Sequence, residues 1–463
     1  MYLKKYHIYF VGIGGIGMSG IAELLLNLGY TVSGSDVKSS DITSRLTELG
    51  GTIHGRHHPD NIVGADVVVV SSAIGPDNQE VAAATKAGIP VIPRAEMLAE
   101  IMRLKYSIAV AGAHGKTSTT SMIAAVLGEG GVDPTVVVGG KLNSLGSNAR
   151  LGNGDFIVAE ADESDGSFLK FTPAISVVTN IDREHLDYYG GLDEIKKVFR
   201  EFIDRIPFYG LAVICLDNEP LQEILPGIKK RCLTYGTNKQ ADFQARRIKA
   251  GGGQIRFSVY QAERQLGDII LNTAGRHNVV NALAAVVVGL ELGIAFETIK
   301  KGLETMAGVH RRLEIKGEAG RVIFVDDYGH HPTEIKTTLQ GIRENWEDRR
   351  LVVVFQPHRY TRTRALFDDF ARSFYQCDAL VMLPVYAAGE APIDKADGFT
   401  LSKEISKHGH KSVYFAETAE AACRYLEEEL RPGDLLLTLG AGNVWRVGEQ
   451  VMEKRRTIVE VGN

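Results

Sequence analysis

The sequence predicts an α/β protein made of three consecutive domains. Three times along the chain a short apolar run is followed by a turn and a helical pattern, and these restarts lie near His7, Tyr106 and Arg321. Uninterrupted apolar runs are typical of buried parallel strands, and their alternation with helices is typical of α/β folds. The chain has 463 residues, enough for about three domains. We expect domains at residues 1–105, 106–314 and 315–463.

The first domain is predicted from four strands and one long helix. Residues 7–11, 31–33 and 66–70 are the clearer strands, and a weaker strand lies near residues 52–53. Between the first two strands, apolar residues recur at helical spacing from Met18 to Leu28. A strand, a helix and a second strand in this order predict a parallel sheet.

The second and third domains repeat this alternation. The second domain has predicted strands at residues 106–111, 156–159 and 175–178, and predicted helices at residues 117–127 and 279–292. Gly293 follows the second of these helices, as glycine commonly does at a helix end. In the third domain, strands are predicted at residues 321–325, 351–355, 379–382 and 435–438, with helices between them.

The composition is that of an ordinary globular protein. Hydrophobic residues make up 44% and charged residues 24%, which excludes disorder as a class. A net charge of −5 argues against a nucleic-acid surface. No apolar run approaches the ~18–20 residues of a membrane span, and the four cysteines are scattered. We therefore expect a cytoplasmic protein that acts on small molecules and binds neither nucleic acid nor membranes; its oligomeric state stays open.

A first glycine motif follows the first strand. Residues 12–17 read Gly-Ile-Gly-Gly-Ile-Gly and precede the first helix. Glycines let the backbone approach a pyrophosphate, and a helix N-terminus offers free N–H groups. Asp36 lies just past the second strand, where an acid could bind a ribose. The motif fits a dinucleotide or a nucleoside diphosphate sugar equally well, and a tight turn without a ligand stays possible.

A second glycine motif lies between the strand at residues 106–111 and the next helix. Residues 112–118 read Gly-Ala-His-Gly-Lys-Thr-Ser. Such a loop can wrap its N–H groups around phosphates, while Lys116 neutralises phosphate oxygens and the Thr117 hydroxyl binds Mg²⁺. The first glycine stands three residues before Gly115, which is closer than in the common P-loop. The spacing favours a family with a shortened loop.

Acidic residues and a histidine follow the next strands of the second domain. Residues 160–165, Glu-Ala-Asp-Glu-Ser-Asp, come directly after a predicted strand, where Mg²⁺ is commonly held beside a P-loop. Glu160 is the strongest candidate ligand among them, and the others could form an acidic surface turn. His185 lies in the run Asn-Ile-Asp-Arg-Glu-His-Leu-Asp at residues 180–187. Its spacing fits a metal or phosphate role about as well as a structural one.

Four further polar clusters lie at residues 275–282, 310–312, 326–332 and 356–362. His330 and His331 are adjacent, but no further ligands stand nearby at zinc spacing. Arg359 and Arg362 follow a strand end, where α/β sheets bind ligands. Two arginines suit a carboxylate or a phosphate, because guanidinium makes paired hydrogen bonds. A solvated basic turn is the alternative.

Together these motifs resemble the Mur ligase family, ATP-dependent enzymes that form amide bonds in peptidoglycan precursor synthesis. The resemblance covers essentially the whole chain. It rests on the shortened Gly-x-x-Gly-Lys-Thr loop, the runs at residues 160–165 and 180–187, and Gly-Arg-His-Asn-Val-Val-Asn-Ala at residues 275–282. The motifs at residues 11–20, 326–332 and 356–363 are more specific, because they resemble a single branch of the family. They are similar to the branch that joins L-alanine to UDP-N-acetylmuramate; the nearest confusable branch attaches a whole tripeptide to the same sugar nucleotide.

The resemblance implies a Rossmann-like UDP-binding domain, a P-loop ATPase domain and a Rossmann-like domain for the amino acid. It implies ATP and Mg²⁺ as cofactors and ligation through an acyl phosphate. Lys116, His185, His330 and Arg312 would be catalytic, with His330 as the candidate general base. The implied sites are as follows: UDP-sugar at Gly14, Gly15, Ile16, Gly17, His57, Ser71, Ser72 and Arg94; ATP at Gly112, Ala113, His114, Gly115, Lys116, Thr117, Ser118, Asn278, Asn281, Arg312 and Asp327; alanine at Tyr328, His330, Arg359 and Arg362; and metal at Thr117, Glu160 and His185. In the UDP-sugar site, His58 is an alternative candidate to His57.

Two other functions compete with a ligase. An NAD-dependent dehydrogenase would explain the first glycine motif and Asp36, and a nucleotide-switched binding protein would explain the second motif alone. Several ligases of the family also carry a carbamylated lysine in the helix after His185. Here Arg200 is placed at or near that position, with Lys196 and Lys197 close by. Arginine stays protonated and does not form that carbamate, so we expect no requirement for bicarbonate.

Overall fold

The computed structural model describes residues 6–71, 74–138, 149–185, 188–306 and 308–461. It divides into two compact units, which are described separately. The first contains residues 1–246, 258–269 and 280–307, and the second contains residues 247–257, 270–279 and 308–463. Three sheets, each combined with helices, confirm the predicted α/β class with three domains. The exact residues at which one domain passes into the next stay a prediction.

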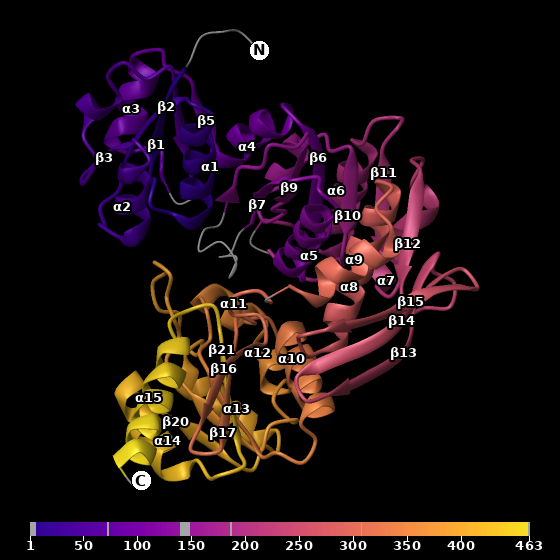
Figure 1. Cartoon of the computed structure of the whole chain (residues 1–463). Helices are drawn as coiled ribbons and strands as arrows, with labels where there is room; N and C mark the ends of the chain where they lie inside the picture. Colours follow the sequence, from indigo (N-terminus) through magenta and orange to yellow (C-terminus); the bar gives the residue numbers. More distant parts are fainter. Residues whose placement is uncertain (1–5, 72–73, 139–148, 186–187, 307, 462–463) are drawn as a thin grey trace. The chain divides into compact units, whose positions relative to one another are not determined.

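The first sheet, drawn in indigo and violet in Figure 1, has the strand order β3-β2-β1-β4-β5. Its strands are β1 (His7–Val11), β2 (Thr31–Ser35), β3 (Thr52–His54), β4 (Val67–Val70) and β5 (Val91–Pro93), and all neighbours pair in parallel. Their centre is apolar and fully buried, as at Phe10 and Val69. The chain order reverses between β1 and β4. Open parallel sheets bind ligands beyond the carboxyl ends of strands at such a reversal.

Two of the four α-helices of the first domain start at side-chain caps. The helices are α1 (Ile16–Asn27), α2 (Asp41–Glu48), α3 (Gln79–Lys86) and α4 (Arg94–Met102), with a short 3₁₀ helix η1 (Pro59–Ile62). Ser40 and Thr43 form a capping box on α2, and the Asn78 side chain accepts from two N–H groups of α3. Both devices satisfy N–H groups that a helix start leaves open.

The second sheet has the order β15-β14-β13-β12-β11-β10-β6-β9-β7-β8. Its central strands are β6 (Tyr106–Ala111), β9 (Phe156–Glu160), β10 (Ile175–Val178) and β11 (Leu211–Cys215), and they pair in parallel. The others are β7 (Thr135–Val137), β8 (Ala149–Arg150), β12 (Cys232–Gly236), β13 (Phe243–Gly251), β14 (Gln254–Gln261) and β15 (Arg264–Leu271). Strands β7, β8 and β11 to β15 were not predicted. Strand β14 lacks a continuous apolar run, because Arg256 and Ser258 interrupt its apolar residues.

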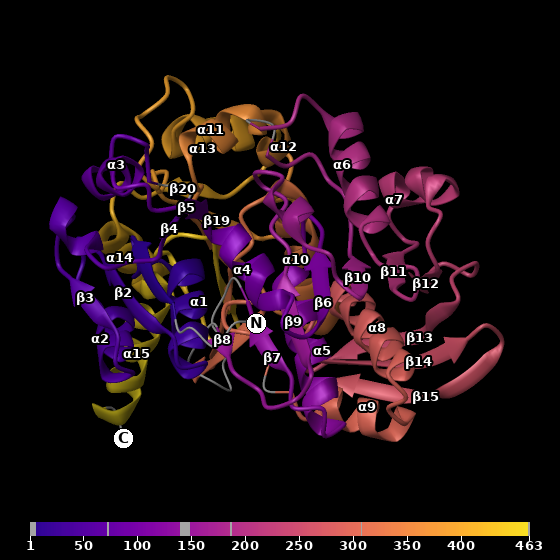
Figure 2. The ribbon, with the colours of Figure 1, turned by 90° about the horizontal axis from the view of Figure 1, so that it is seen from above.

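The helices of this part are α5 (Lys116–Glu129), α6 (Leu192–Asp204), α7 (Glu219–Ile224), α8 (Arg276–Glu291) and α9 (Phe296–Glu304), with the 3₁₀ helices η2 (Ser167–Lys170) and η3 (Leu225–Gly227). Helix α5 contacts β9 and α9 (Figure 2). The predicted helix at residues 279–292 begins three residues earlier, at Arg276, and Gly293 follows it with φ +77°. A positive φ there costs glycine little.

The third sheet has the order β16-β17-β21-β18-β19-β20. Its strands are β16 (Glu314–Ala319), β17 (Val322–Asp327), β18 (Leu351–Phe355), β19 (Ala379–Met382), β20 (Val413–Phe415) and β21 (Leu435–Leu439). Only β16 among these is antiparallel to its neighbour. The helices are α10 (Pro332–Asn345), α11 (Tyr360–Ala365), α12 (Phe367–Ala371), α13 (Gly398–Lys407), α14 (Ala419–Glu429) and α15 (Trp445–Val461). Apolar clusters are built on its strands, one including Val353 and Leu437 and the other Val352 and Leu436.

No helix within the described part of the chain combines the length and the apolar character needed to cross a bilayer.

Candidate active site

The second glycine motif forms a tight loop between β6 and α5. Gly112 has φ +139°, and a Cβ atom there would lie 2.1 Å from the Thr179 hydroxyl oxygen. Gly115 has φ +81°, and a Cβ atom there would lie 2.8 Å from the Asn281 side-chain oxygen. Both positions therefore require glycine, because the backbone conformation and the nearby atoms exclude a larger side chain.

The segment after β10 holds this loop in place. The His114 backbone N–H donates to Asn180 Oδ1 at 2.8 Å, and Asn180 Nδ2 donates to the His114 carbonyl at 2.9 Å. The Thr179 hydroxyl donates to the same carbonyl at 2.6 Å. Because β6, β9 and β10 are parallel neighbours, their carboxyl ends bring these distant segments together.

Lys116 is paired with a buried carboxylate. Its Nζ lies 2.9 Å from Glu163 Oε1 and 3.0 Å from Oε2, and donates to the Gly112 carbonyl at 2.6 Å. Glu163 is only 2% exposed. Burial alone would lower the pKa of Lys116, but the charges of Glu163, Asp162 and Glu184 and the hydrogen bond to Glu163 together outweigh burial and raise the pKa. Burial would likewise raise the pKa of Glu163, and Lys116 holds it lower. Both groups are therefore charged at neutral pH.

Glu163 also faces a histidine and a second acid. Ligand atoms of Glu163, Glu184 and His185 lie within 4.8 Å of one another, and His185 Nε2 is 3.5 Å from Glu163 Oε1. Burial opposes protonation of His185, but the Glu163 carboxylate raises its pKa overall. His185 has φ +54°, a left-handed conformation that only a few per cent of non-glycine residues adopt. Lys116, Glu163, Glu184 and His185 are called the central cluster below.

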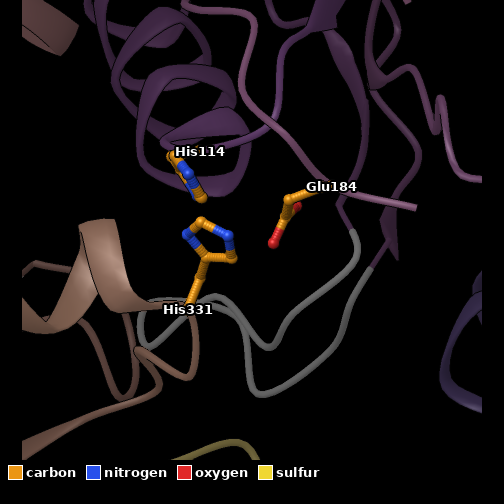
Figure 3. Close-up of side chains that lie close together, drawn as sticks. All are labelled: His114, Glu184 and His331. Carbon is orange, nitrogen blue, oxygen red and sulfur yellow. The ribbon is translucent and has the colours of Figure 1, made fainter. Parts of the chain in front are cut away.

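Figure 3 shows His114, which comes from the glycine loop, and Glu184, which comes from the segment after β10. Their ligand atoms lie within 4.8 Å, and His114 Nε2 is 2.8 Å from Asp182 Oδ2. His331, also drawn there, belongs to the second unit. It caps α10 by accepting from the Thr333 N–H.

The predicted metal ligands are distributed around this edge of the sheet. Glu160 is the last residue of β9, and Thr117 is buried in the first turn of α5. Only His185 of the predicted metal ligands belongs to a set of three close donor atoms within the described residues of this unit. Sequence reasoning named Glu163 only as one acid in a run. Its burial and its contact with Lys116 depend on the loop that returns it to the sheet edge.

The first glycine motif is organised differently. Gly12 has φ +78°, and the N–H groups of Gly12 and Ile13 donate to the Ser35 carbonyl at 2.8 and 3.0 Å. The Gly14 N–H donates to Asp36 Oδ2 at 2.9 Å. Asp36 therefore bonds to its own glycine loop instead of extending toward a ribose, which disfavours the dehydrogenase interpretation.

The Arg94 side chain lies against this loop. A Cβ atom on Gly17 would be 3.1 Å from Arg94 Nη1, and Arg94 Nη2 is 3.2 Å from Asp162 Oδ2. Ser71 follows β4 at the same edge, while Ser72 lies outside the described residues. Gly14 to Gly17, Ser71 and Arg94 thus lie around the carboxyl ends of β1 and β4, where the strand order reverses.

The two neighbouring histidines have different surroundings. His57 Nδ1 lies 2.9 Å from Glu80 Oε2, and its side chain is 24% exposed. His58 is 45% exposed, lies 3.5 Å from Asp60 and caps η1. The structure thus favours His57 over His58 as a residue held in a fixed orientation. Sequence reasoning missed Glu80, since an acid in the first turn of a helix is ordinarily a surface residue.

In the second unit, two arginines and two aspartates surround the end of β17. Arg311 is 8% exposed and its Nε donates to Asp326 Oδ2 at 2.8 Å. Asp327 accepts from the Leu313 and Gly329 N–H groups, each at 2.8 Å, and burial raises its pKa to about 6. Arg312 lies over the Tyr328 ring, 5.1 Å from its centre. Both carboxylate oxygens of Asp327 therefore accept hydrogen bonds from the neighbouring backbone, whereas the resemblance implied that Asp327 binds ATP.

The predicted adenine ligands lie on α8. Asn278 is buried, and its Nδ2 donates to the Ala274 carbonyl at 2.8 Å. Asn281 belongs to the first unit, where it faces Gly115 of the glycine loop. Within the first unit, Asn281 therefore lies directly beside the second glycine motif. Asn278 belongs to the second unit.

Two histidines and two arginines gather beyond β17 and β18. The His330 and His358 ring centres are 5.8 Å apart, and Tyr386 stacks on His358 at 5.6 Å. Arg362 Nη1 donates to His358 Nδ1 at 3.3 Å. Arg359 has φ +68° and is exposed. His330, His358, Arg359 and Arg362 are called the C-terminal cluster below. His358 directly precedes Arg359 in the sequence, a signal that the sequence analysis did not use.

Both histidines of the C-terminal cluster are neutral at pH 7. Burial lowers the pKa of His330 to about 3, more than Glu334 raises it. Burial, assisted by Arg362 and Arg359, lowers the pKa of His358 to about 4. His330 Nδ1 donates to the Tyr328 carbonyl at 3.2 Å, which leaves Nε2 as the lone-pair nitrogen. A pKa this low makes His330 a weak general base.

Comparison with known proteins gives one consistent family. Residues 7–106 match the model described as Mur ligase family, catalytic domain, residues 110–289 the Mur ligase middle domain, and residues 311–442 the Mur ligase, glutamate ligase domain. The chain is 72% identical to a UDP-N-acetylmuramate–L-alanine ligase of Desulfosudis oleivorans over 98% of this chain and 99% of that one. The corresponding ligase of Geobacter sulfurreducens is 55% identical, with 98% of both chains covered.

Solved structures agree with this assignment. The UDP-N-acetylmuramate-alanine ligase of Thermotoga maritima has a TM-score of 0.82 and 30% identity, covering 98% of this chain and 100% of that one. A murein peptide ligase of Psychrobacter arcticus shares the fold, with a TM-score of 0.70 at 24% identity and coverage of 97% and 99%. The three family models and the relatives together span nearly the whole sequence, so this chain belongs to the Mur ligase family.

Proposed function

We propose that this chain uses ATP to join L-alanine to the lactyl carboxylate of UDP-N-acetylmuramate, releasing ADP and phosphate, in peptidoglycan precursor synthesis. The observation that carries the proposal is the central cluster, where Lys116 of a phosphate-binding loop is paired with the buried Glu163 beside Glu184 and His185. The substrates follow from the relatives, which are UDP-N-acetylmuramate–L-alanine ligases at up to 72% identity among those compared.

The reaction needs an activated carboxylate, because a carboxylate oxygen is a poor leaving group. A carboxylate oxygen of the sugar nucleotide attacks the γ-phosphorus of ATP, ADP leaves, and an acyl phosphate forms. The neutral amine of alanine then attacks the carbonyl carbon, phosphate leaves, and the amine's extra proton passes to a base. Lys116 stabilises charge on the transferring phosphoryl group. In this scheme Lys116 exchanges its contact with Glu163 for one with phosphate.

The residues at the sheet edge also fit a divalent cation. Two carboxylates and one imidazole offer ligand atoms within 4.8 Å, and oxygen-rich sets of this kind accept Mg²⁺. The positively charged Lys116 already lies against Glu163, which indicates a site that favours cations. Thr117, Glu160 and His185, with Glu163 and Glu184 nearby, would hold Mg²⁺, which would neutralise charge on the phosphates.

In the remaining assignments each substrate has its principal binding loop at a different sheet. UDP-N-acetylmuramate binds beyond β1 and β4, at Gly14 to Gly17, His57, Ser71, Ser72 and Arg94. ATP binds at residues 112–118 with Asn278, Asn281, Arg312 and Asp327. Alanine binds at Tyr328, His330, Arg359 and Arg362, where a guanidinium can pair with its carboxylate. Since His330 is neutral, its Nε2 can accept a hydrogen bond from the amine and orient it.

The test is ADP formation by the purified protein with each substrate omitted in turn. We expect turnover only when ATP, UDP-N-acetylmuramate and L-alanine are all present, with one UDP-N-acetylmuramoyl-L-alanine formed per ADP. Replacing L-alanine with the tripeptide of the related branch distinguishes the two ligases. ADP formation without the sugar nucleotide, or NADH production from a hydroxy substrate, would contradict the proposal.

A further inference from the structure

Glu80 is a fully buried carboxylate in the first sheet domain. It lies in the first turn of α3 and is 0% exposed. Burial alone would raise its pKa, but hydrogen bonds from Ser35, Tyr9 and other donors hold the pKa below its usual value. An ionised carboxylate can only accept hydrogen bonds, so every neighbour must be a donor.

Five groups donate to this carboxylate. Three donate to Oε1: the Tyr9 hydroxyl at 2.6 Å, Asn61 Nδ2 at 2.8 Å and the His58 backbone N–H at 3.2 Å. The other two, the Ser35 hydroxyl and His57 Nδ1, lie 2.6 and 2.9 Å from Oε2. The donors come from β1, the end of β2 and the segment around η1. Glu80 therefore ties that segment to the ends of two central strands.

This arrangement determines which nitrogen of His57 carries the proton. Nδ1 faces Glu80 Oε2 and the Ser35 oxygen, both at 2.9 Å, and the Ser35 hydroxyl proton is directed to Glu80. Nδ1 must therefore be the N–H donor. In the neutral ring Nε2 then carries the lone pair. Among the described residues, Nε2 has no hydrogen-bond partner. The 24% exposure of His57 leaves its side chain accessible from solvent while Glu80 is sealed beneath it.

We propose that Glu80 is a positioning residue of the sugar-nucleotide site, which fixes His57 so that its Nε2 accepts a hydrogen bond from a hydroxyl or N–H of the UDP portion. The proposal rests on the proposed function for the identity of the ligand. A carboxylate that accepts a hydrogen bond from the ring N–H of a ligand-binding histidine holds the imidazole in one tautomer and one orientation. The buried charge of Glu80 is otherwise costly, and its five donors offset that cost.

The test substitution is Glu80→Gln, which keeps the shape but replaces one acceptor oxygen with an NH₂ group. The glutamine oxygen is expected on the side with three donors, so its NH₂ faces Ser35 and His57. His57 Nδ1 must then become an acceptor, and its proton moves to Nε2. We expect the Kd of UDP-N-acetylmuramate, measured by calorimetry, to rise about tenfold, as expected from the loss of one hydrogen bond. The Kd of ATP should stay within about twofold.

A double-mutant cycle separates positioning from general loss of structure. If Glu80 acts through His57, Glu80→Gln weakens sugar-nucleotide binding in the parent but not in a His57→Ala background. Additive losses would overturn the proposal. The matched control is Glu23→Gln, which removes another buried glutamate of the same domain; Arg45 Nη2 donates to it at 2.7 Å. It should leave the Kd unchanged.

The ¹⁵N shifts of His57 give a readout that does not depend on the ligand. In ¹⁵N-histidine protein the parent should show an Nδ1–H imidazole, and Glu80→Gln should show an Nε2–H imidazole. An unchanged tautomer would overturn the proposal. Because this measurement needs no substrate, it tests Glu80 even if the parent does not bind the sugar nucleotide, so the two proposals can fail separately.

Discussion

The central cluster and the C-terminal cluster both lie at the carboxyl edge of a parallel sheet, yet their charges are opposite in character. In the central cluster, a buried lysine is neutralised by carboxylates, and Glu163 raises the pKa of His185. In the C-terminal cluster, two arginines stand beside histidines whose pKa values burial lowers to about 3 and 4. In the central cluster, carboxylates balance the positive charge. The C-terminal cluster combines the positive charge of two arginines with neutral imidazoles.

The difference corresponds to the two halves of the proposed reaction. Phosphoryl transfer requires cations near phosphate; Glu163 holds Lys116 at the glycine loop and would help to hold Mg²⁺ there. Attack by an amine requires a neutral nitrogen, because an ammonium group has no lone pair. A site that keeps imidazoles neutral and binds a carboxylate through arginine suits an amino acid. The following experiments test this difference between the central and C-terminal clusters, beginning with the largest expected effect.

Lys116→Ala should remove the charge on which the central cluster depends. We expect turnover to fall at least about a thousandfold, since positioned cations contribute that much to phosphoryl transfer. The Kd of UDP-N-acetylmuramate, measured by calorimetry, should be nearly unchanged, because that ligand is assigned to the first sheet. A comparable loss of sugar-nucleotide affinity would show that the two glycine loops do not bind separate ligands.

Arg359→Lys keeps the charge of the C-terminal cluster but removes the planar guanidinium. We expect the KM for alanine to rise about 10- to 100-fold, as expected from losing a charge-assisted hydrogen bond. The KM for ATP should change far less. The exposed Arg364 of α11, the helix that Arg359 precedes, provides the matched control, since Arg364→Lys should leave both constants unchanged. Equal effects of Arg359→Lys on both constants would contradict a carboxylate-binding role.

The buried, neutral His277 should make the second unit sensitive to acid. Burial lowers the pKa of His277 from 6.5 to about 4. Below pH 6.5 the unfolded chain therefore binds more protons than the folded chain, and stability falls as the pH decreases toward 4. The only two tryptophans, Trp346 and Trp445, lie in this unit and report its unfolding in urea.

We expect the urea midpoint followed by tryptophan fluorescence to decrease between pH 6.5 and 4.5, and His277→Asn to reduce that decrease. His408→Asn is the control, because His408 is half-buried at a helix end and hydrogen-bonded to the Glu404 carbonyl. A pH dependence that is identical in His277→Asn and the parent would exclude His277 as a cause.

The smallest expected effect is that of bicarbonate. The Arg200 guanidinium lies against Gly227, where a Cβ atom would be 2.6 Å from Arg200 Cζ. Lys196 Nζ is held by Asp193 at 2.6 Å and by Glu223 at 2.7 Å. Neither side chain is therefore free to supply a carbamate to the central cluster. Activity after exhaustive removal of CO₂ should stay within about twofold of the untreated enzyme. Bicarbonate rescue that disappears in Lys196→Ala or Lys197→Ala would contradict this expectation.

The sequence by itself determined the three α/β domains and most of their central strands. Continuous apolar runs such as residues 106–111 and 351–355 can only be satisfied in buried parallel strands, and the glycines after them mark turns toward a ligand. Motif resemblance supplied the family, which the comparisons confirmed. Strands β13 to β15 escaped prediction because polar residues interrupt their apolar positions, so these strands lack that continuous apolar signal.

Only the tertiary structure decided which polar groups meet. Asp36 looked like a ribose ligand, but it bonds to Gly14, 22 residues away in sequence. Glu163 and Glu80 looked like ordinary acids, yet each is sealed beneath the side chain that it holds, Lys116 in one case and His57 in the other. The physical reason is that a buried charge is tolerated only where donors converge on it. That convergence depends on which strand ends lie side by side, which no local pattern in the sequence records.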